Sequence, residues 1–207
     1  MTSVVIRAVL FDFGGVISEE GFYNGLINLA EKQALDARSI PQQGMDAAYD
    51  SGFVLGKGSV SDFWGLMRQR TGIQGDDNYL SDRIFDGFQI RPLMIKLVRM
   101  LRDKHYITGL LSDQTHWLDE LNECDHFYKE FDYVFNSYVM GKGKRDPSVF
   151  TDVADSLKLM PAEILFIDDN IKNISNAKSV DLNTIHYRDY YSLVQEIESL
   201  LHITLNA

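Results

Sequence analysis

Residues 4–11 read Val-Val-Ile-Arg-Ala-Val-Leu-Phe, and Asp12-Phe13-Gly14-Gly15 follow at once. A run that is apolar without alternation predicts a strand buried on both faces, as in a parallel sheet. A carboxylate at the end of such a strand is costly to bury unless it is paired. Asp12 is therefore either the cap of a turn or a functional group, and Gly14-Gly15 would let a ligand approach the main chain closely.

Further apolar runs that end in polar residues occupy residues 107–111, 133–135, 164–167 and 183–187. Helical spacing of apolar residues separates them, within residues 92–101, 146–157, 170–179 and 190–201. This alternation of strand and helix predicts an α/β fold with a Rossmann-like parallel sheet.

Residues 17–91 contain no buried-strand run and show helical spacing instead, for example at Phe22 and Leu26, and at Phe63 and Met67 after an expected helix cap at Ser61. We therefore expect two parts. Residues 1–16 and 92–207 form the α/β core, and residues 17–91 form an inserted helical module.

The chain of 207 residues carries 30 acidic and 20 basic side chains, a formal net charge of -10. Such acidity argues against nucleic acid or an anionic membrane as partner, because both require a basic surface. The single cysteine, Cys124, cannot form an internal disulfide. Neither a signal peptide nor a membrane-spanning run is present in the sequence, so a soluble, cytoplasmic protein is expected.

Polar residues at the ends of three expected strands are candidates for one site: Asp12 after the first, Ser112 after the second, and Asp168-Asp169 after the fourth. In a doubly wound sheet, ligands bind at the carboxyl ends of the strands. If the first strand lies between the second and fourth, these side chains emerge together. Carboxylate oxygens facing water and phosphate suit Mg²⁺.

The sequence resembles the haloacid dehalogenase (HAD) superfamily at four motifs in the family's order. They are Asp12-Phe13-Gly14-Gly15-Val16, Leu111-Ser112, Lys144-Arg145-Asp146-Pro147 and Phe166-Ile167-Asp168-Asp169-Asn170. The insert after the first motif is similar to the helical cap of the family's first subclass.

The resemblance implies a role for each matching residue. Asp12 would be the nucleophile that forms an aspartyl-phosphate, Ser112 would donate to a phosphoryl oxygen, and Lys144 would neutralise charge. Mg²⁺ would be held by Asp12, Asp169 and the carbonyl of Gly14, with Asp168 bound more weakly or through water.

Three positions depart from the family pattern. Gly14 stands where the family's phosphatases usually carry an Asp that acts as general acid. Glu19 or Glu20 could replace that acid, or both could be solvated residues at the start of a helix. Arg145 stands where Pro is usual and would grip a substrate anion. Asp113 stands where relatives often have Asn, adding negative charge to the substrate-binding region.

The sequence thus predicts a Mg²⁺-dependent phosphatase acting on a small phosphorylated metabolite, as a monomer or dimer. Two alternatives stay open. The first is a 2-haloacid dehalogenase, which needs the same nucleophile without a metal. The second is a HAD-like protein that binds a phosphorylated ligand without catalysis.

Overall fold

A computed structural model of the chain describes residues 5–205, and its strands form one parallel sheet. The strands are β1 (Ala8–Phe11), β2 (Ile107–Ser112), β3 (Tyr133–Asn136), β4 (Ile164–Asp168) and β5 (Asn183–His186). Their order is β3-β2-β1-β4-β5, and Phe11 is in register with Leu110 on one side and Ile167 on the other. The predicted α/β fold is confirmed, and β1 lies between β2 and β4, the order that brings the ends of these three strands together.

The first strand is shorter than its apolar run, because β1 begins only at Ala8. Before it, the amide of Arg7 donates to the carbonyl of Glu163 (2.8 Å) and the carbonyl of Arg7 accepts from Ile107 (3.0 Å). Val4, where the predicted run starts, lies outside the described residues, as do the outer ends of the predicted core at residues 1–4 and 206–207.

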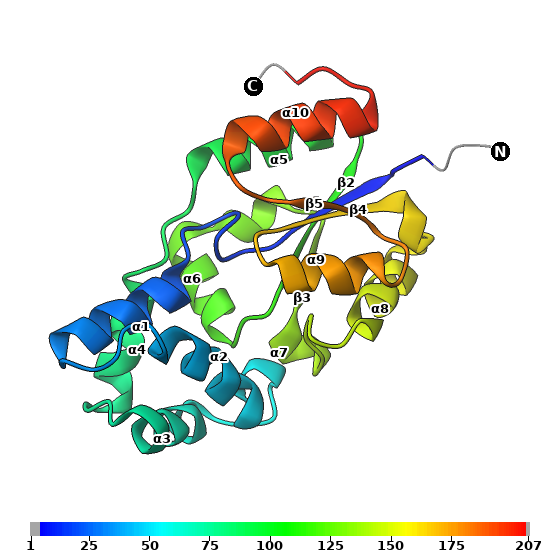
Figure 1. The fold of residues 1–207 in the computed structure, drawn as a ribbon. Helices are drawn as coiled ribbons and strands as arrows, with labels where there is room; N and C mark the ends of the chain where they lie inside the picture. Colours follow the sequence, from blue (N-terminus) through cyan, green and yellow to red (C-terminus); the bar gives the residue numbers. More distant parts are fainter. Residues whose placement is uncertain (1–4, 206–207) are drawn as a thin grey trace.

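Helices cover both faces of the sheet (Figure 1). Ala8 and Leu10 pack in one apolar cluster with residues of α8 (Ser148–Leu157) and α9 (Ile171–Lys178). Val9 and Phe11 face a second cluster that includes α5 (Pro92–Asp103) and α10 (Tyr190–Leu201). This burial on both faces explains why β1 is a continuous apolar run rather than an alternating one.

Short elements complete the connections between strands and helices. They are α6 (Trp117–Asp125), α7 (Ser137–Met140) and the 3₁₀ turns η2 (Phe127–Glu130) and η3 (Pro161–Glu163). Among the described residues, no helix combines the length and the apolar character needed to cross a bilayer.

Between β1 and α5 the chain is helical: α1 (Gly21–Lys32), α2 (Ile40–Asp50), the 3₁₀ turn η1 (Phe53–Leu55), α3 (Val60–Thr71) and α4 (Asp77–Phe85). We call α1–α4 the helical segment. In it α1 packs against α2 and α4, and α2 packs against α3. Figure 1 shows the segment beyond the end of the sheet toward which β1 runs.

The expected cap of α3 at Ser61 is wrong, because the helix begins earlier. Ser59 is the N-cap: its hydroxyl accepts from the amide of Asp62 (3.1 Å), and the Asp62 carboxylate accepts from the amide of Ser59 (2.8 Å). This reciprocal capping box satisfies two amides at the helix start, and it places Ser61 inside the first turn.

The chain leaves the sheet and returns to it at adjacent points. Ser18 forms an isolated bridge with Ile90. The amide of Glu19 donates to the carbonyl of Gln89 (2.8 Å), and the amide of Arg91 donates to the carbonyl of Ile17 (2.9 Å). The two connections to the helical segment therefore run side by side.

Candidate active site

A pocket of about 1000 Å³ lies between the helical segment and the carboxyl ends of β1, β2 and β4. All but one of the residues matched to the four motifs and their flanking positions line it: Asp12, Gly14, Ser112, Asp113, Lys144, Arg145 and Asp169. The exception, Asp168, is fully buried at the end of β4, in contact with Lys144. Of the two candidate replacement acids, Glu20 lines the pocket and Glu19 does not. The topology thus brings the four separated motifs together.

Lys144 is the electrostatic centre of this cluster. Only 1 % of the residue is exposed. Its Nζ lies 2.8 Å from Asp12 Oδ1 and 2.7 Å from Asp168 Oδ2. Burial by itself lowers the pKa of a lysine, but the charges of Asp12 and Asp168 outweigh it, and the pKa of Lys144 is raised. The side chain is therefore a permanent cation held between two carboxylates.

Asp12, Asp168 and Asp169 each place a carboxylate oxygen within 4.8 Å of the others. Burial raises the pKa of Asp12 well above its usual value; Lys144 offsets part of this rise, while Asp168 and Asp169 add to it. Partial desolvation of the Asp169 carboxylate, with the charge of Asp168 second, also raises the pKa of Asp169. The single positive charge of Lys144 does not balance three carboxylates. A hard divalent cation that prefers oxygen ligands, such as Mg²⁺, therefore fits the cluster.

The two adjacent carboxylates of the fourth motif differ in their surroundings. Asp168 Oδ1 accepts from the amide of Asn170 (2.7 Å), and its Oδ2 accepts from Lys144 Nζ (2.7 Å) and Asn173 Nδ2 (3.0 Å). Asp169 lies in the exposed loop after β4 and borders the pocket. Asp168 is thus fixed within the protein, while Asp169 faces the space where a ligand would bind.

The loop around Asp169 depends on one glycine and one histidine. Gly15 has φ +79°, and a β-carbon there would lie 2.1 Å from Asp169 Oδ2, so a side chain is excluded by both conformation and space. Nε2 of His186, at the end of β5, is hydrogen-bonded to the carbonyl oxygen of Asp169 (2.8 Å). Both contacts hold Asp169 beside Asp12.

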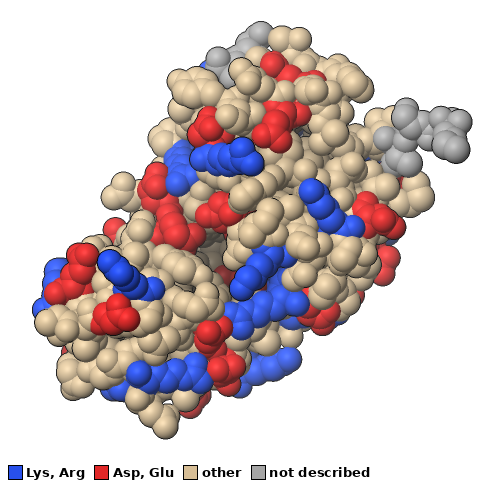
Figure 2. Space-filling view, in the orientation of Figure 1, with Lys and Arg blue, Asp and Glu red and all other residues tan. Residues whose placement is uncertain are grey.

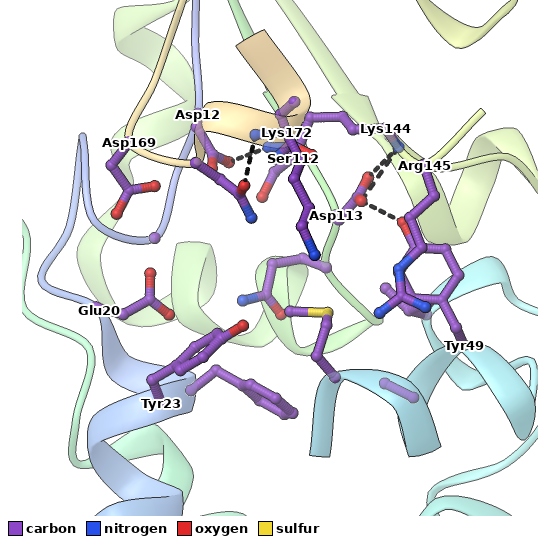
Figure 3. Close-up of a pocket in the computed structure, with 18 of the residues that line it drawn as sticks. Asp12, Glu20, Tyr23, Tyr49, Ser112, Asp113, Lys144, Arg145, Asp169 and Lys172 are labelled. Atoms are coloured by element: carbon purple, nitrogen blue, oxygen red, sulfur yellow. Dashed lines mark hydrogen bonds and ion pairs between the residues drawn. The ribbon is translucent and has the colours of Figure 1, made fainter. Parts of the chain in front are cut away.

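Glu20 and Glu19 point in different directions. The Glu20 carboxylate borders the pocket beside Gly14: a β-carbon on Gly14 would lie 3.2 Å from Glu20 Oε2. Burial, with the charge of Asp169 second, raises the pKa of Glu20 to about 7. Glu19 is instead half-exposed and bonded to Arg91 at 2.9 Å. Figure 3 shows the Glu20 carboxylate directed toward Asp169.

The polar residues after β2 have different surroundings. Ser112 is buried at the strand end and borders the pocket. Both oxygens of Asp113 accept from the amide of Lys144 (2.9 and 3.1 Å), and the Tyr49 hydroxyl donates to Asp113. Asp113, proposed as a substrate contact, therefore has its carboxylate bonded within the protein.

Arg145 borders the pocket and is also bonded within the protein. It pairs with Asp46 of α2 (2.8 Å), and its guanidinium carbon lies 4.0 Å from the centroid of the Tyr49 ring.

Over the face seen in Figure 2, basic and acidic side chains are interspersed rather than segregated.

Sequence reasoning missed several residues of this pocket. Tyr49, Asp46 and Lys172 line it, and Figure 3 shows the Lys172 side chain extending into it. Asn173 was missed as well: it lies in the first turn of α9 and donates to Asp168 (3.0 Å). Tyr49 had no local signal in the sequence, since its role depends on how α2 packs against a distant loop.

A model of the haloacid dehalogenase-like hydrolase family matches residues 6–181. The chain belongs to this family. Among curated relatives, the HAD-like hydrolase is 24% identical to bifunctional epoxide hydrolase 2 of Sus scrofa over 98% of its own length. It spans only 40% of that relative. It is also 23% identical to the sesquiterpene phosphatase astK of Aspergillus oryzae, covering 94% of this chain and 96% of that one.

Solved structures share the fold of this HAD-like hydrolase. A HAD family enzyme from Bacteroides thetaiotaomicron, in complex with magnesium and inorganic phosphate, is 25% identical with a TM-score of 0.62, covering 91% of this chain and 98% of that one. L-2-haloacid dehalogenase from Xanthobacter autotrophicus is 20% identical with a TM-score of 0.65, covering 94% and 83%.

Proposed function

We propose that this HAD-like hydrolase is a Mg²⁺-dependent phosphatase that hydrolyses a small phosphorylated metabolite. The observation that carries the proposal is the convergence of Asp12, Asp168 and Asp169 around the buried ammonium of Lys144, at one end of a large pocket. The named activity of the sesquiterpene phosphatase, and the magnesium and phosphate bound to the Bacteroides thetaiotaomicron enzyme, support it.

Asp12 is the nucleophile in this proposal. Its Oδ1 accepts from Lys144 Nζ (2.8 Å) and from the amide of Phe13 (2.7 Å), which fixes the carboxylate at the pocket floor. A carboxylate oxygen attacks phosphorus, the bond from phosphorus to the leaving oxygen breaks, and an aspartyl-phosphate forms. Lys144 balances the charge of the transferred group, and the Ser112 hydroxyl donates to one of its oxygens.

Glu20 is the proton donor in this proposal, because its carboxylate lies beside Gly14, where the side chain of a second acidic residue would begin. Protonated Glu20 gives its proton to the leaving oxygen. It then takes a proton from the water that attacks phosphorus in the aspartyl-phosphate. The bond from phosphorus to the Asp12 oxygen breaks and phosphate departs, which leaves Asp12 as a carboxylate and Glu20 protonated, as at the start.

Mg²⁺ would be held by the carboxylates of Asp12 and Asp169 and the carbonyl of Gly14. Asp168 would orient Lys144 rather than bind the cation directly, because both of its oxygens accept hydrogen bonds from protein groups. When bound, Mg²⁺ supplies positive charge to the phosphate oxygens.

Residues 17–91 act as the helical cap in this proposal, on an α/β core of residues 1–16 and 92–207. The wall of the pocket opposite Asp12 comes from α1 and α2, with Phe22, Tyr23, Met45 and Ala48 among its lining residues. These side chains would contact the part of the substrate that leaves with the oxygen, and so would set specificity.

Hydrolysis of a panel of aryl and alkyl phosphates, with Mg²⁺ or with EDTA, tests the proposal. We expect turnover only with Mg²⁺, loss of turnover in Asp12→Asn, and full turnover in the exposed control Asp86→Asn. Halide release from 2-haloacids that persists in EDTA would instead identify a dehalogenase. Binding of inorganic phosphate without turnover of any ester would identify a binding protein.

A further inference from the structure

A hydrogen-bonded chain connects α2 of the helical segment to the main chain of Lys144. The hydroxyl of Tyr49 donates to Asp113 Oδ2. The same carboxylate accepts the amide of Lys144 with both oxygens, at 2.9 and 3.1 Å. Figure 3 shows Asp113 between Tyr49 and Lys144. One carboxylate thus joins a tyrosine of the helical segment to a residue at the reaction centre.

A second contact holds the residue after Lys144 to the same helix. The guanidinium carbon of Arg145 lies 4.0 Å from the centroid of the Tyr49 ring, and its terminal nitrogen lies 2.8 Å from Asp46 Oδ1. A guanidinium stacked on an aromatic ring and paired with a carboxylate is well oriented. Tyr49 therefore contacts Arg145 with its ring and Asp113 with its hydroxyl.

Gly143, the residue before Lys144, completes the arrangement. A β-carbon at this position would lie 2.3 Å from the Tyr49 hydroxyl oxygen and 3.0 Å from Asp113 Oδ1. The hydroxyl is therefore seated directly against the main chain. Because the contacts with α2 fall on both sides of Lys144, they restrain the backbone from which its long side chain extends.

We infer that Tyr49 is a positioning residue of the phosphatase reaction, acting through Asp113 to align Lys144 with Asp12. The inference rests on the proposed function. Lys144 Nζ reaches Asp12 Oδ1 at 2.8 Å from a fixed main chain, and an error of about 1 Å in placing a catalytic group costs up to ~10²-fold in rate. The helical segment thereby contributes to alignment of the reacting groups as well as to the pocket wall.

Steady-state kinetics on p-nitrophenyl phosphate with Mg²⁺ separate positioning from binding. In Tyr49→Phe we expect kcat to fall about 10-fold and KM to change less than about 2-fold, since Lys144 loses alignment while the pocket wall stays intact. The matched control is Tyr79→Phe, on an exposed residue of α4, with unchanged kinetics. An unchanged kcat in Tyr49→Phe would overturn the inference.

Variants at Asp113 test whether Tyr49 acts through this carboxylate. Asp113→Ala should lower kcat at least as much as Tyr49→Phe, and adding Tyr49→Phe to it should lower kcat no further. Asp113→Asn keeps an acceptor for the Lys144 amide and should recover most of the rate. Equal fold losses from Tyr49→Phe with and without Asp113→Ala would show that Tyr49 acts independently, and would overturn the inference.

Hydrogen exchange at the Lys144 amide gives a readout that needs no turnover. Tyr49→Phe should raise its exchange rate about 10-fold, because the carboxylate that holds the amide loses its fixed donor, while Tyr79→Phe leaves it unchanged. An unchanged exchange rate in Tyr49→Phe would overturn the inference. If the wild type hydrolyses no phosphate ester, the proposed function fails. Faster exchange in Tyr49→Phe would then show only that Tyr49 holds the loop of Lys144.

Discussion

The Glu20 carboxylate fills the space beside Gly14, such that a β-carbon on Gly14 would lie 3.2 Å from Glu20 Oε2 and 3.6 Å from Glu20 Oε1. The family's phosphatases usually carry an acidic residue at the position of Gly14. Here a carboxylate reaches the same region from the N-cap of α1 instead. A second acid is therefore present at the site, even though the first motif contains only Asp12.

Glu20→Gln should lower the rate at which an alkyl phosphate releases its alcohol in the first turnover by about 10²–10⁴-fold, the usual contribution of a general acid. For p-nitrophenyl phosphate, whose leaving group needs no proton, the loss in this step should be much smaller. Glu19→Gln removes a neighbouring charge that is bonded to Arg91, and should affect neither substrate. Single-turnover release of the two leaving groups checks the prediction, and an equal loss on both esters in this step would contradict it.

Gly14→Asp should restore the alkyl phosphatase activity of Glu20→Gln. Gly14 has no positive φ, and the nearest obstacle to a side chain there is the end of the Glu20 side chain, which is flexible. An aspartate is therefore tolerated and places its carboxyl group in the same region. The measurement is kcat of the double variant on the alkyl ester, and failure to exceed Glu20→Gln would contradict the prediction.

Asp12→Asn should stabilise the protein in EDTA by about 0.5–2 kcal/mol while abolishing turnover. The pKa of Asp12 is raised in the folded state, by burial first, so the folded chain binds this proton more tightly than the unfolded chain. Its contribution to stability therefore declines as pH rises above the unfolded value of about 3.9, and at neutral pH the ionised group opposes folding.

Urea unfolding in EDTA at pH 7 measures this effect. Adding Mg²⁺ at about 100 times its Kd should stabilise the wild type by about 2.7 kcal/mol and the variant by much less, because a ligand is missing. If Asp12→Asn were less stable than the wild type in EDTA, ionised Asp12 would not oppose folding, and the prediction would be contradicted.

Lys144→Met should destabilise the fold by about 3–5 kcal/mol, because it leaves Asp12 and Asp168 buried without their cation. Lys142→Met is the matched control: Lys142 pairs with Asp152 near the surface, and its loss should cost less than about 1 kcal/mol. Urea unfolding of both variants checks the difference. Similar costs for the two lysines would mean that Lys144 contributes no more than a surface pair.

Two helical glycines should respond to alanine with opposite signs. In α1, a β-carbon on Gly25 would lie 2.8 Å from the Cα of Ile84 in α4, so Gly25→Ala should destabilise by about 1–3 kcal/mol. In α3, a β-carbon on Gly65 would meet nothing within 4 Å, so Gly65→Ala should stabilise by about 0.5–1 kcal/mol. Thermal unfolding measures both, and the same sign at both sites would contradict the described packing.

The sheet was predictable because its signals are local. Each strand buried on both faces is a continuous apolar run, and the polar residues after Phe11, Leu111 and Ile167 mark where strands end. The convergence of Asp12 with Asp169 then followed from the position of β1 between β2 and β4. Helix α10, expected at residues 190–201, has these bounds in the structure.

The remaining features depend on packing between distant parts of the chain. Nothing local distinguishes Glu20 from Glu19 as a pocket residue, since only the start of α1 decides which one turns inward. Tyr49 reaches Asp113 across 64 positions of sequence. The cap at Ser59 differs, because the spacing Ser59-x-x-Asp62 is a capping-box signal that is local in the sequence. Helix α6 was not predicted, because it is short and its few buried residues form no long helical pattern.

The hydrogen bonds between Glu19 and Gln89 and between Arg91 and Ile17 bring the two ends of residues 20–88 together. We therefore expect this stretch to be exchangeable as one piece. Both ends of the segment are hydrogen-bonded to each other, so another family member's segment could be joined at the same two points without moving β1 or α5. Such a chimera would keep Asp12, Asp168, Asp169 and Lys144 of this chain. It would take the proton donor at Glu20, the residue at Tyr49 and the pocket wall from the donor. One scaffold could in this way be adapted to new molecules by transplanting a single continuous stretch of chain.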